Sequence, residues 1–195
     1  MPTGEDHSAV FADRRRKLQD LRDAGVDPFP HRFEGVEPIA SVRAAHSSLE
    51  PGEESGARHR VAGRLAARRG QGKMAFLDLV DRSGRVQLQA RVDELGEQGM
   101  ERLLELDLGD VIGVDGVAFS TRRGELTLRI ERYELLAKSL RPPPEKHHGL
   151  KDVETRFRRR ELDLIANEEA RELFILRAQA IAAIRSFLDA EWFIE

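Results

Sequence analysis

Residues 59–137 constrain the fold most, because short apolar runs of strand length alternate there with glycine-rich or polar turns. Small or apolar residues alternate with basic ones in HRVAGRLAARR, and a glycine turn separates this run from KMAFLDLVD. The segment DRSG then leads directly into RVQLQARV. Two apolar runs joined by so short an Asp/Ser/Gly connection predict a β-hairpin, so the stretch begins with three consecutive strands.

A short helix and two further strands complete this stretch. Residues 93–105 are expected to form the helix, with buried contacts from Leu95, Leu103, Leu104 and Leu106. The fourth and fifth strands follow in DLGDVIGVDGVAFST and GELTLRIERYELLA. Glycine-bent strands in the order β-β-β-α-β-β are typical of the five-stranded OB-fold barrel. Another small Greek-key barrel is the alternative, but the position of the helix favours the OB fold.

Helical segments flank the predicted barrel, so the fold class is mainly β with flanking helices. Residues 8–24 repeat apolar side chains at helical spacing, whereas 45–57 has the composition of a loop. After the barrel, 150–167 is expected to form one helix, and Asn167 is expected to cap a second one. That second helix carries one apolar stripe, which we interpret as the truncated start of a further domain.

These boundaries divide the chain into four parts. They are an N-terminal helix and loop (1–57), the OB-fold barrel (58–138), a proline-rich linker (139–150) and a truncated helical segment (151–195).

Composition excludes several classes of protein. The chain has a net charge of −3 and contains no cysteine, so disulfides and thiolate metal sites are ruled out. No apolar run reaches the length of a membrane span, and the N-terminal residues lack the apolar part of a secretory signal. A cytoplasmic protein without a membrane segment is therefore expected. His147 and His148 are adjacent, so their side chains diverge on regular structure and no metal site is predicted there.

Catalytic motifs are not recognisable in the sequence, which has no P-loop, dinucleotide-binding glycine turn, nucleophile elbow or helical histidine pair. Basic residues are instead concentrated just before the second strand: every charged residue from Arg58 to Lys73 is Lys or Arg, and Phe76 follows in mid-strand. Facing strands should bring Arg64, Arg69 and Phe76 to one surface, as a barrel that binds single-stranded nucleic acid requires. The alternatives are a solvated face for the charges and a core position for Phe76.

Two polar residues could read a base on such a surface. Gln87 can both donate and accept hydrogen bonds, and Glu125 can only accept one from an N–H group. A uracil edge has one imide N–H between two carbonyl groups, so a glutamine and an acceptor fit it. Simple solvent exposure is the alternative for either residue.

Longer segments of the chain are recognisable together, in particular VAGRLAARRGQGKMAFLDLVDRSGRVQLQ, DLGDVIGVDGVAFSTRRGELTL and LRPPPEKHHGLKDVETRFRRRELDLIAN. With these segments the chain resembles the N-terminal part of class II lysyl-tRNA synthetases. The resemblance implies that the barrel binds the lysine anticodon loop of tRNA, that Phe76 stacks on an anticodon base, and that Gln87 and Glu125 read the central uridine. The predicted nucleic-acid-binding residues are Arg64, Arg68, Arg69, Lys73, Phe76, Gln87 and Glu125.

The resemblance also sets expectations for what lies outside the barrel. Complete family members attach lysine to tRNA with ATP and Mg²⁺ through motifs 2 and 3, which are not in this sequence, so this chain is expected to hold neither a catalytic residue nor a cofactor. Residues 168–190 resemble the start of motif 1 and imply a homodimer. The sequence departs from the family pattern at Gln89, where tyrosine is common, at Glu161, where an aromatic residue is usual, and at Trp192, where glycine is usual.

Three hypotheses for function follow. The chain is the N-terminal part of a lysine–tRNA ligase, or a free-standing, non-catalytic protein that binds tRNA, or a dimerising interaction piece or decayed copy.

Overall fold

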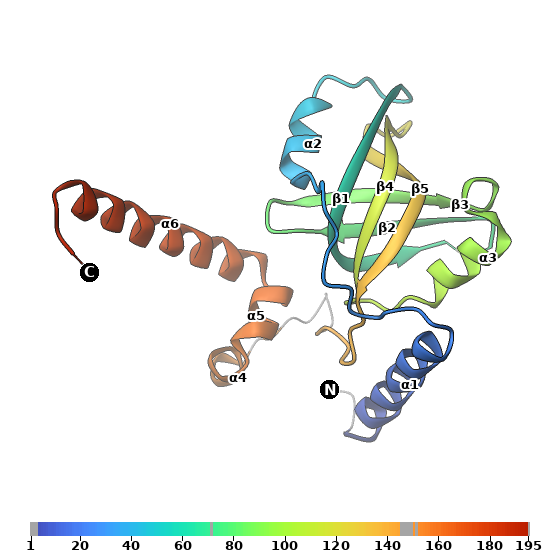
Figure 1. The fold of residues 1–195 in the computed structure, drawn as a ribbon, viewed down its shortest axis with the longest axis horizontal. Coiled ribbons are helices and arrows are strands. Elements are labelled where there is room, and N and C mark those ends of the chain that lie inside the picture. The colour runs from blue at the N-terminus through green and yellow to red at the C-terminus, as the bar shows by residue number, and fades with distance from the viewer. Residues whose placement is uncertain (1–3, 71, 145–149, 151, 195) are drawn as a thin grey trace. The chain divides into compact units, whose positions relative to one another are not determined.

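The computed structural model describes residues 4–70, 72–144, 150 and 152–194 (Figure 1). The chain forms two compact units, Met1–Pro142 and Pro143–Glu195. The first unit contains the sheet and the second contains only helices among its described residues.

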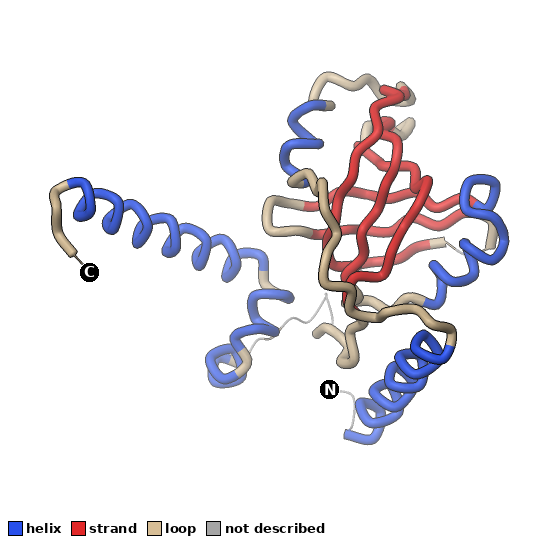
Figure 2. Tube along the Cα trace, in the orientation of Figure 1, coloured by secondary structure: helices blue, strands red, loops and turns tan. Residues whose placement is uncertain are grey.

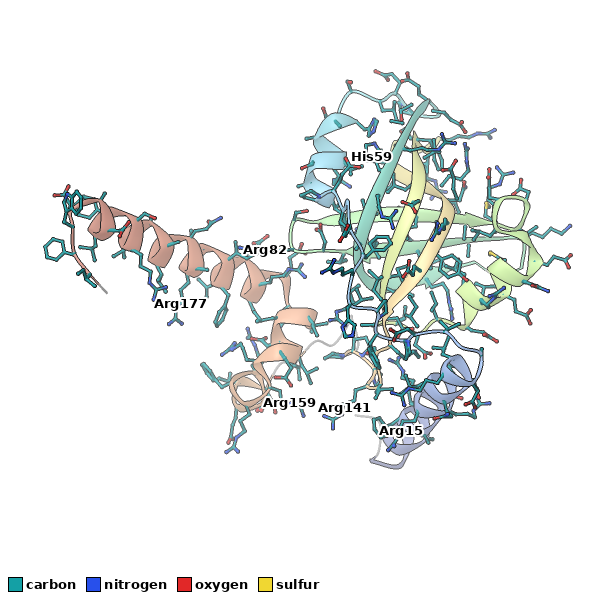
Figure 3. The ribbon with its side chains drawn as sticks, viewed as in Figure 1. Arg15, His59, Arg82, Arg141, Arg159 and Arg177 are labelled. Carbon is teal, nitrogen blue, oxygen red and sulfur yellow. The ribbon has the colours of Figure 1, made fainter. Side chains whose placement is uncertain are left out.

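Five strands form a closed barrel in the first unit, drawn in red in Figure 2. The strands are β1 (Glu54–Arg69), β2 (Met74–Val80), β3 (Arg85–Arg91), β4 (Val111–Ser120) and β5 (Leu126–Ala137). Their spatial order is β1-β2-β3-β5-β4, and only the β3–β5 pair is parallel among them. Helix α3 (Val92–Glu105) lies between β3 and β4 in the chain. The predicted order of strands and helix, and with it the OB fold, is confirmed.

Alternating apolar side chains fill the barrel. On β2, Ala75, Leu77 and Leu79 are fully buried, and Leu88 of β3 and Leu128 of β5 face them in the same core cluster. Burying side chains of this size is the main favourable term in the folding of such a barrel.

One glycine is required where the N-terminal segment crosses β4. A Cβ atom at Gly113 would lie 2.3 Å from the ring of Phe33, and the guanidinium carbon of Arg60 lies 4.1 Å from the centre of that ring. Phe33 therefore packs directly on the backbone of β4, which anchors the segment to the barrel.

Two helices precede the barrel. Helix α1 (Gly4–Asp23) agrees with the helix expected at 8–24, but helix α2 (Ile39–Ala45) was not predicted. Its seven residues are held by tertiary contacts: Ile39 and Val42 are fully buried, and the N–H of Ile39 donates to the carboxylate of Asp81 at 3.0 Å. The loop expected at 45–57 is also too long, because β1 begins at Glu54, which pairs with Phe119 of β4.

A buried ion network closes one end of the barrel unit. The ammonium group of Lys138, just after β5, donates to the carboxylates of Asp107 at 2.5 Å and Asp110 at 2.9 Å. Lys17 of α1 donates to Asp107 from the other side at 2.8 Å, and Arg14 donates to the carbonyl of Ser139 at 3.0 Å. The network joins α1, the α3–β4 connection and the chain leaving β5.

Three helices make up the described part of the second unit: α4 (Val153–Arg158), α5 (Arg160–Ala166) and α6 (Glu168–Ala190). The single helix expected at 150–167 is wrong, because the backbone leaves helical geometry at Arg159 (φ −120°, ψ 56°). The buried carboxylate of Asp163 accepts hydrogen bonds from Arg156 at 2.8 Å and Asn167 at 2.6 Å. Asn167 does occupy the N-cap position of α6, but its side chain makes no capping hydrogen bond.

Helix α6 presents its apolar stripe to solvent within the described residues. Leu173, Leu176, Ile184 and Phe187 are each at least 60% exposed. No helix in the described part of the chain is both long enough and apolar enough to cross a membrane.

Candidate nucleic-acid interface

The outer face of β2, β3 and β5 carries the aromatic and amide side chains that the sequence singled out. Phe76 alternates with buried Ala75 and Leu77, so it points outward and is half-buried; it does not belong to the core cluster. Phe76 lies opposite Gln89 of β3, and Gln87 lies opposite Thr127 of β5. The pairing therefore places Phe76 and Gln87 on adjacent strands of the same face.

Two arginines flank this face through one shared carboxylate. Arg69 pairs in register with Phe76 and donates to Asp78 at 3.1 Å, and Arg85 donates to the other oxygen of Asp78 at 3.3 Å. The Asp78 side chain is only 5% exposed, whereas both guanidinium groups are more than half exposed. One carboxylate thus orients two cations whose remaining donors face solvent, which leaves this end of the face positively charged.

Sequence reasoning missed Asp78 and Arg85. The signal was present, since Asp78 is two residues after Phe76 on β2 and Arg85 is two residues before Gln87 on β3, so strand alternation places all four on one face.

At the other end of the face, the arginine has two acidic partners. Arg129 of β5 donates to Glu54 at 2.6 Å and lies 3.5 Å from Glu94. The hydrogen bond from Arg129 holds the pKa of Glu54 below its ordinary value, and the same bond raises the pKa of Arg129. The uncompensated positive charge of the face therefore lies at the end formed by Arg69 and Arg85.

The other three basic residues of the predicted set do not contribute to this group of side chains. Arg64 is on the outer side of β1, but its guanidinium donates to the carbonyl of Gly109 at 2.6 Å. Arg68 donates to the carbonyl of Leu106 at 3.0 Å, and Lys73 is exposed in the turn before β2. The structure therefore brings together Arg69, Phe76 and Gln87, whereas Arg64 and Arg68 bind backbone around the end of α3.

Glu125 lies in the connection between β4 and β5, beside Gln87. Its carboxylate is 3.9 Å from the guanidinium of Arg43 on α2. The two residues line a shallow pocket of about 450 Å³ together with Ala40, Ser83, Gly84 and Arg85. Thr127 connects Glu125 to Gln87, because its hydroxyl group lies 3.0 Å from Gln87 Oε1 and 3.1 Å from the carbonyl oxygen of Glu125.

Metal ligands are not grouped among the residues that the structure describes: no cluster of three or more His, Asp or Glu side chains there could hold an ion. His147 and His148 lie outside the described residues. What the outer face offers instead is a half-buried aromatic ring that points outward, an amide side chain, and two guanidinium groups oriented by Asp78. These are the groups that stack on bases, pair with base edges and bind phosphates.

Comparisons with known proteins agree with this chemistry. Residues 59–136 match the tRNA anticodon family of OB-fold nucleic acid binding domains. The chain is 46% identical over 191 residues to a lysine–tRNA ligase of Moorella thermoacetica, 42% over 193 residues to one of Magnetococcus marinus, and 40% over 188 residues to one of Halalkalibacterium halodurans.

These matches cover 98%, 98% and 95% of the chain, but the chain spans only 38% of the length of each relative. Residues 59–136 are therefore similar to OB-fold nucleic acid binding domains, in a chain that matches the N-terminal region of lysine–tRNA ligases.

Proposed function

We propose that the outer face of β2, β3 and β5 binds the anticodon loop of a lysine tRNA and reads its central uridine. The observation that carries this proposal is the grouping of Phe76, Gln87 and Arg69 on one face of an anticodon-type barrel, with Glu125 beside them. The ring of Phe76 supplies a stacking surface, Gln87 and Glu125 supply polar groups for a base edge, and Arg69 supplies charge for the phosphates.

For the whole protein we propose a lysine–tRNA ligase, which attaches lysine to tRNA with ATP and Mg²⁺ in the cytoplasm. The identity to ligases over nearly all of this chain supports the proposal. We assign no chemical step of that reaction to residues 1–195. The chain's part in the reaction is to recognise the substrate tRNA.

We also propose that the protein forms a homodimer through residues 168–190. The exposed stripe on α6 supports this, since Leu173, Leu176 and Phe187 present a contiguous apolar surface at helical spacing. Sedimentation of the chain as a concentration-dependent dimer, weakened by Leu176→Glu, is the expected result; a monomer at all concentrations would contradict the proposal.

Binding of the purified chain to two anticodon stem-loops tests the RNA-binding proposal. One loop carries the lysine anticodon UUU, and the other has its central uridine replaced by cytidine. At physiological salt we expect tighter binding of the uridine loop, by about 1–3 kcal/mol, the usual discrimination of a good pair of base contacts. Equal affinities would show that the face does not read this base.

A further inference from the structure

Thr127 is an outer-face residue that has no exposure to solvent. It alternates with Leu126 and Leu128, whose side chains turn inward, yet its own side chain is fully buried. Two acceptors lie within reach of the single proton of its hydroxyl group: Oε1 of Gln87, its partner across the parallel β3–β5 pair, at 3.0 Å, and the backbone carbonyl of Glu125 at 3.1 Å. A single buried hydroxyl thus lies between the side-chain amide of Gln87 and the backbone of Glu125.

The chemistry of this contact determines what Gln87 can offer. A side-chain amide has one acceptor and two donors, and rotation of the amide exchanges them. With Oε1 held by the Thr127 hydroxyl at 3.0 Å, the Nε2 donors remain for an incoming base. Uracil presents a carbonyl acceptor at its O4 position, whereas cytosine presents an amino donor there. An amide fixed in this orientation accepts uracil and opposes cytosine.

We propose that Thr127 is a positioning residue for uridine discrimination, which fixes the orientation of the Gln87 amide through its hydroxyl group; this inference rests on the proposed anticodon reading. Thr127 acts through Gln87 and does not itself contact the RNA. Valine would fill the same β-branched space without the hydroxyl, and the burial of this site would favour valine if packing were its only role. Burying a hydroxyl group costs desolvation free energy, which its hydrogen bond offsets.

The test measures the ratio of affinities for the UUU loop and the loop with the central cytidine. Thr127→Val should reduce this ratio by about tenfold, which corresponds to one hydrogen bond at the upper end of the usual range. Thr127→Ser restores the hydroxyl and should keep the wild-type ratio. Ser120→Ala is the matched control, because Ser120 is also a buried residue of the barrel with a hydroxyl group, which donates to the backbone carbonyl of Thr121 at 3.4 Å and, within the described part of the chain, not to Gln87 or Glu125.

A double-mutant cycle separates positioning from general stability. In a Gln87→Ala background, Thr127→Val should leave the affinity ratio unchanged, since the amide that it positions is gone. Thr127→Ala, which also lacks the hydroxyl, should reproduce the loss if the valine variant folds poorly.

Each outcome decides the matter. A wild-type preference for uridine that persists in Thr127→Val and Thr127→Ala overturns the role of Thr127 and leaves the proposed function standing. An equal loss in Thr127→Ser, or additive losses in the cycle, also overturns it. Equal affinities for the two loops in the wild-type chain overturn the proposed function and this inference together.

Discussion

The barrel unit and helix α6 differ in which side chains they bury. The barrel unit buries charge, since Lys138 and Asp110 are 2% and 0% exposed and satisfy each other inside the protein. Helix α6 exposes apolar surface: Leu173, Leu176 and Phe187 remain more than 60% exposed over the described residues. The comparison shows that the barrel derives its stability from its own contacts, whereas the stripe of α6 contributes almost nothing to the folding of this chain. Surface of that kind is expected to act in association.

The largest effect should come from breaking the buried ion network of the barrel. Lys138→Ala leaves the carboxylates of Asp107 and Asp110 without their shared cation and should lower the free energy of unfolding by about 3–5 kcal/mol. The Lys17 side chain also contacts Asp107 but is 30% exposed, so Lys17→Ala should lower the free energy of unfolding by less than about 1 kcal/mol. Urea unfolding, followed by the absorbance of Tyr133, the single tyrosine of the chain, measures the free energy of unfolding of both variants. Equal small losses would show that the network is not structural.

A matched pair of leucines sharpens the contrast. Leu128→Ala opens a cavity in the barrel core and should lower the free energy of unfolding by about 2–5 kcal/mol. Leu176→Ala changes an exposed side chain and should alter it by less than about 0.5 kcal/mol. Chemical denaturation of the two variants, measured at low protein concentration to avoid association, gives the comparison. Similar costs would mean that the stripe of α6 packs within the chain.

Acid should destabilise both units, so the two are expected to differ less in their response to pH than in their burial of side chains. Burial raises the pKa of Asp107, but hydrogen bonds from Lys138 and Lys17 outweigh burial and hold that pKa below its ordinary value. The pKa of Asp163 is also lowered, because hydrogen bonds from Asn167 and Arg156 outweigh its burial.

A carboxyl group whose folded pKa lies below its unfolded value stabilises the protein fully above the unfolded pKa, and this stability is lost as pH falls through the folded pKa. Both the Tyr133 signal and the helical circular dichroism should therefore weaken below about pH 4. A barrel whose stability stays constant down to pH 2 would contradict the role given to Asp107.

A stabilising effect of modest size is expected at the end of α6. Trp192 adopts the left-handed conformation (φ 66°) after the helix, and the N–H of Phe193 donates to the carbonyl of Leu188 at 3.0 Å, which closes the helix terminus. Glycine adopts this conformation without strain, and the Trp192 ring is 93% exposed, so little packing is lost. Trp192→Gly should stabilise α6 by about 1 kcal/mol, read as increased helical circular dichroism on heating, while Trp192→Ala should give no such gain.

Sequence reasoning succeeded where a single periodic pattern governs the structure. The expectation that facing strands bring Arg69 and Phe76 to one surface agrees with the register of β1 and β2, and Gln87 of β3 lies on the same face. Sequence reasoning did not anticipate the position of Arg68, because an irregularity between Leu65 and Ala67 shifts the register of β1 and places Arg68 opposite Leu77. Nor did it anticipate that Arg64 donates to the carbonyl of Gly109, which is a contact between segments distant in the sequence. Helix α2 was missed because its seven residues depend on Asp81 and on a buried site that exists only in the folded barrel.

A pair of phenylalanine variants tests the central claim, that recognition of the anticodon loop belongs to the outer face of the barrel. Phe76 lies on that face, and Phe187 is an exposed phenylalanine of α6. Affinity for the UUU stem-loop at physiological salt is measured for the wild-type chain, Phe76→Ala and Phe187→Ala. The account predicts a loss of about 1–3 kcal/mol for Phe76→Ala, the usual contribution of one stacked base, and no change for Phe187→Ala. An unchanged affinity in Phe76→Ala, or a loss confined to Phe187→Ala, would contradict it.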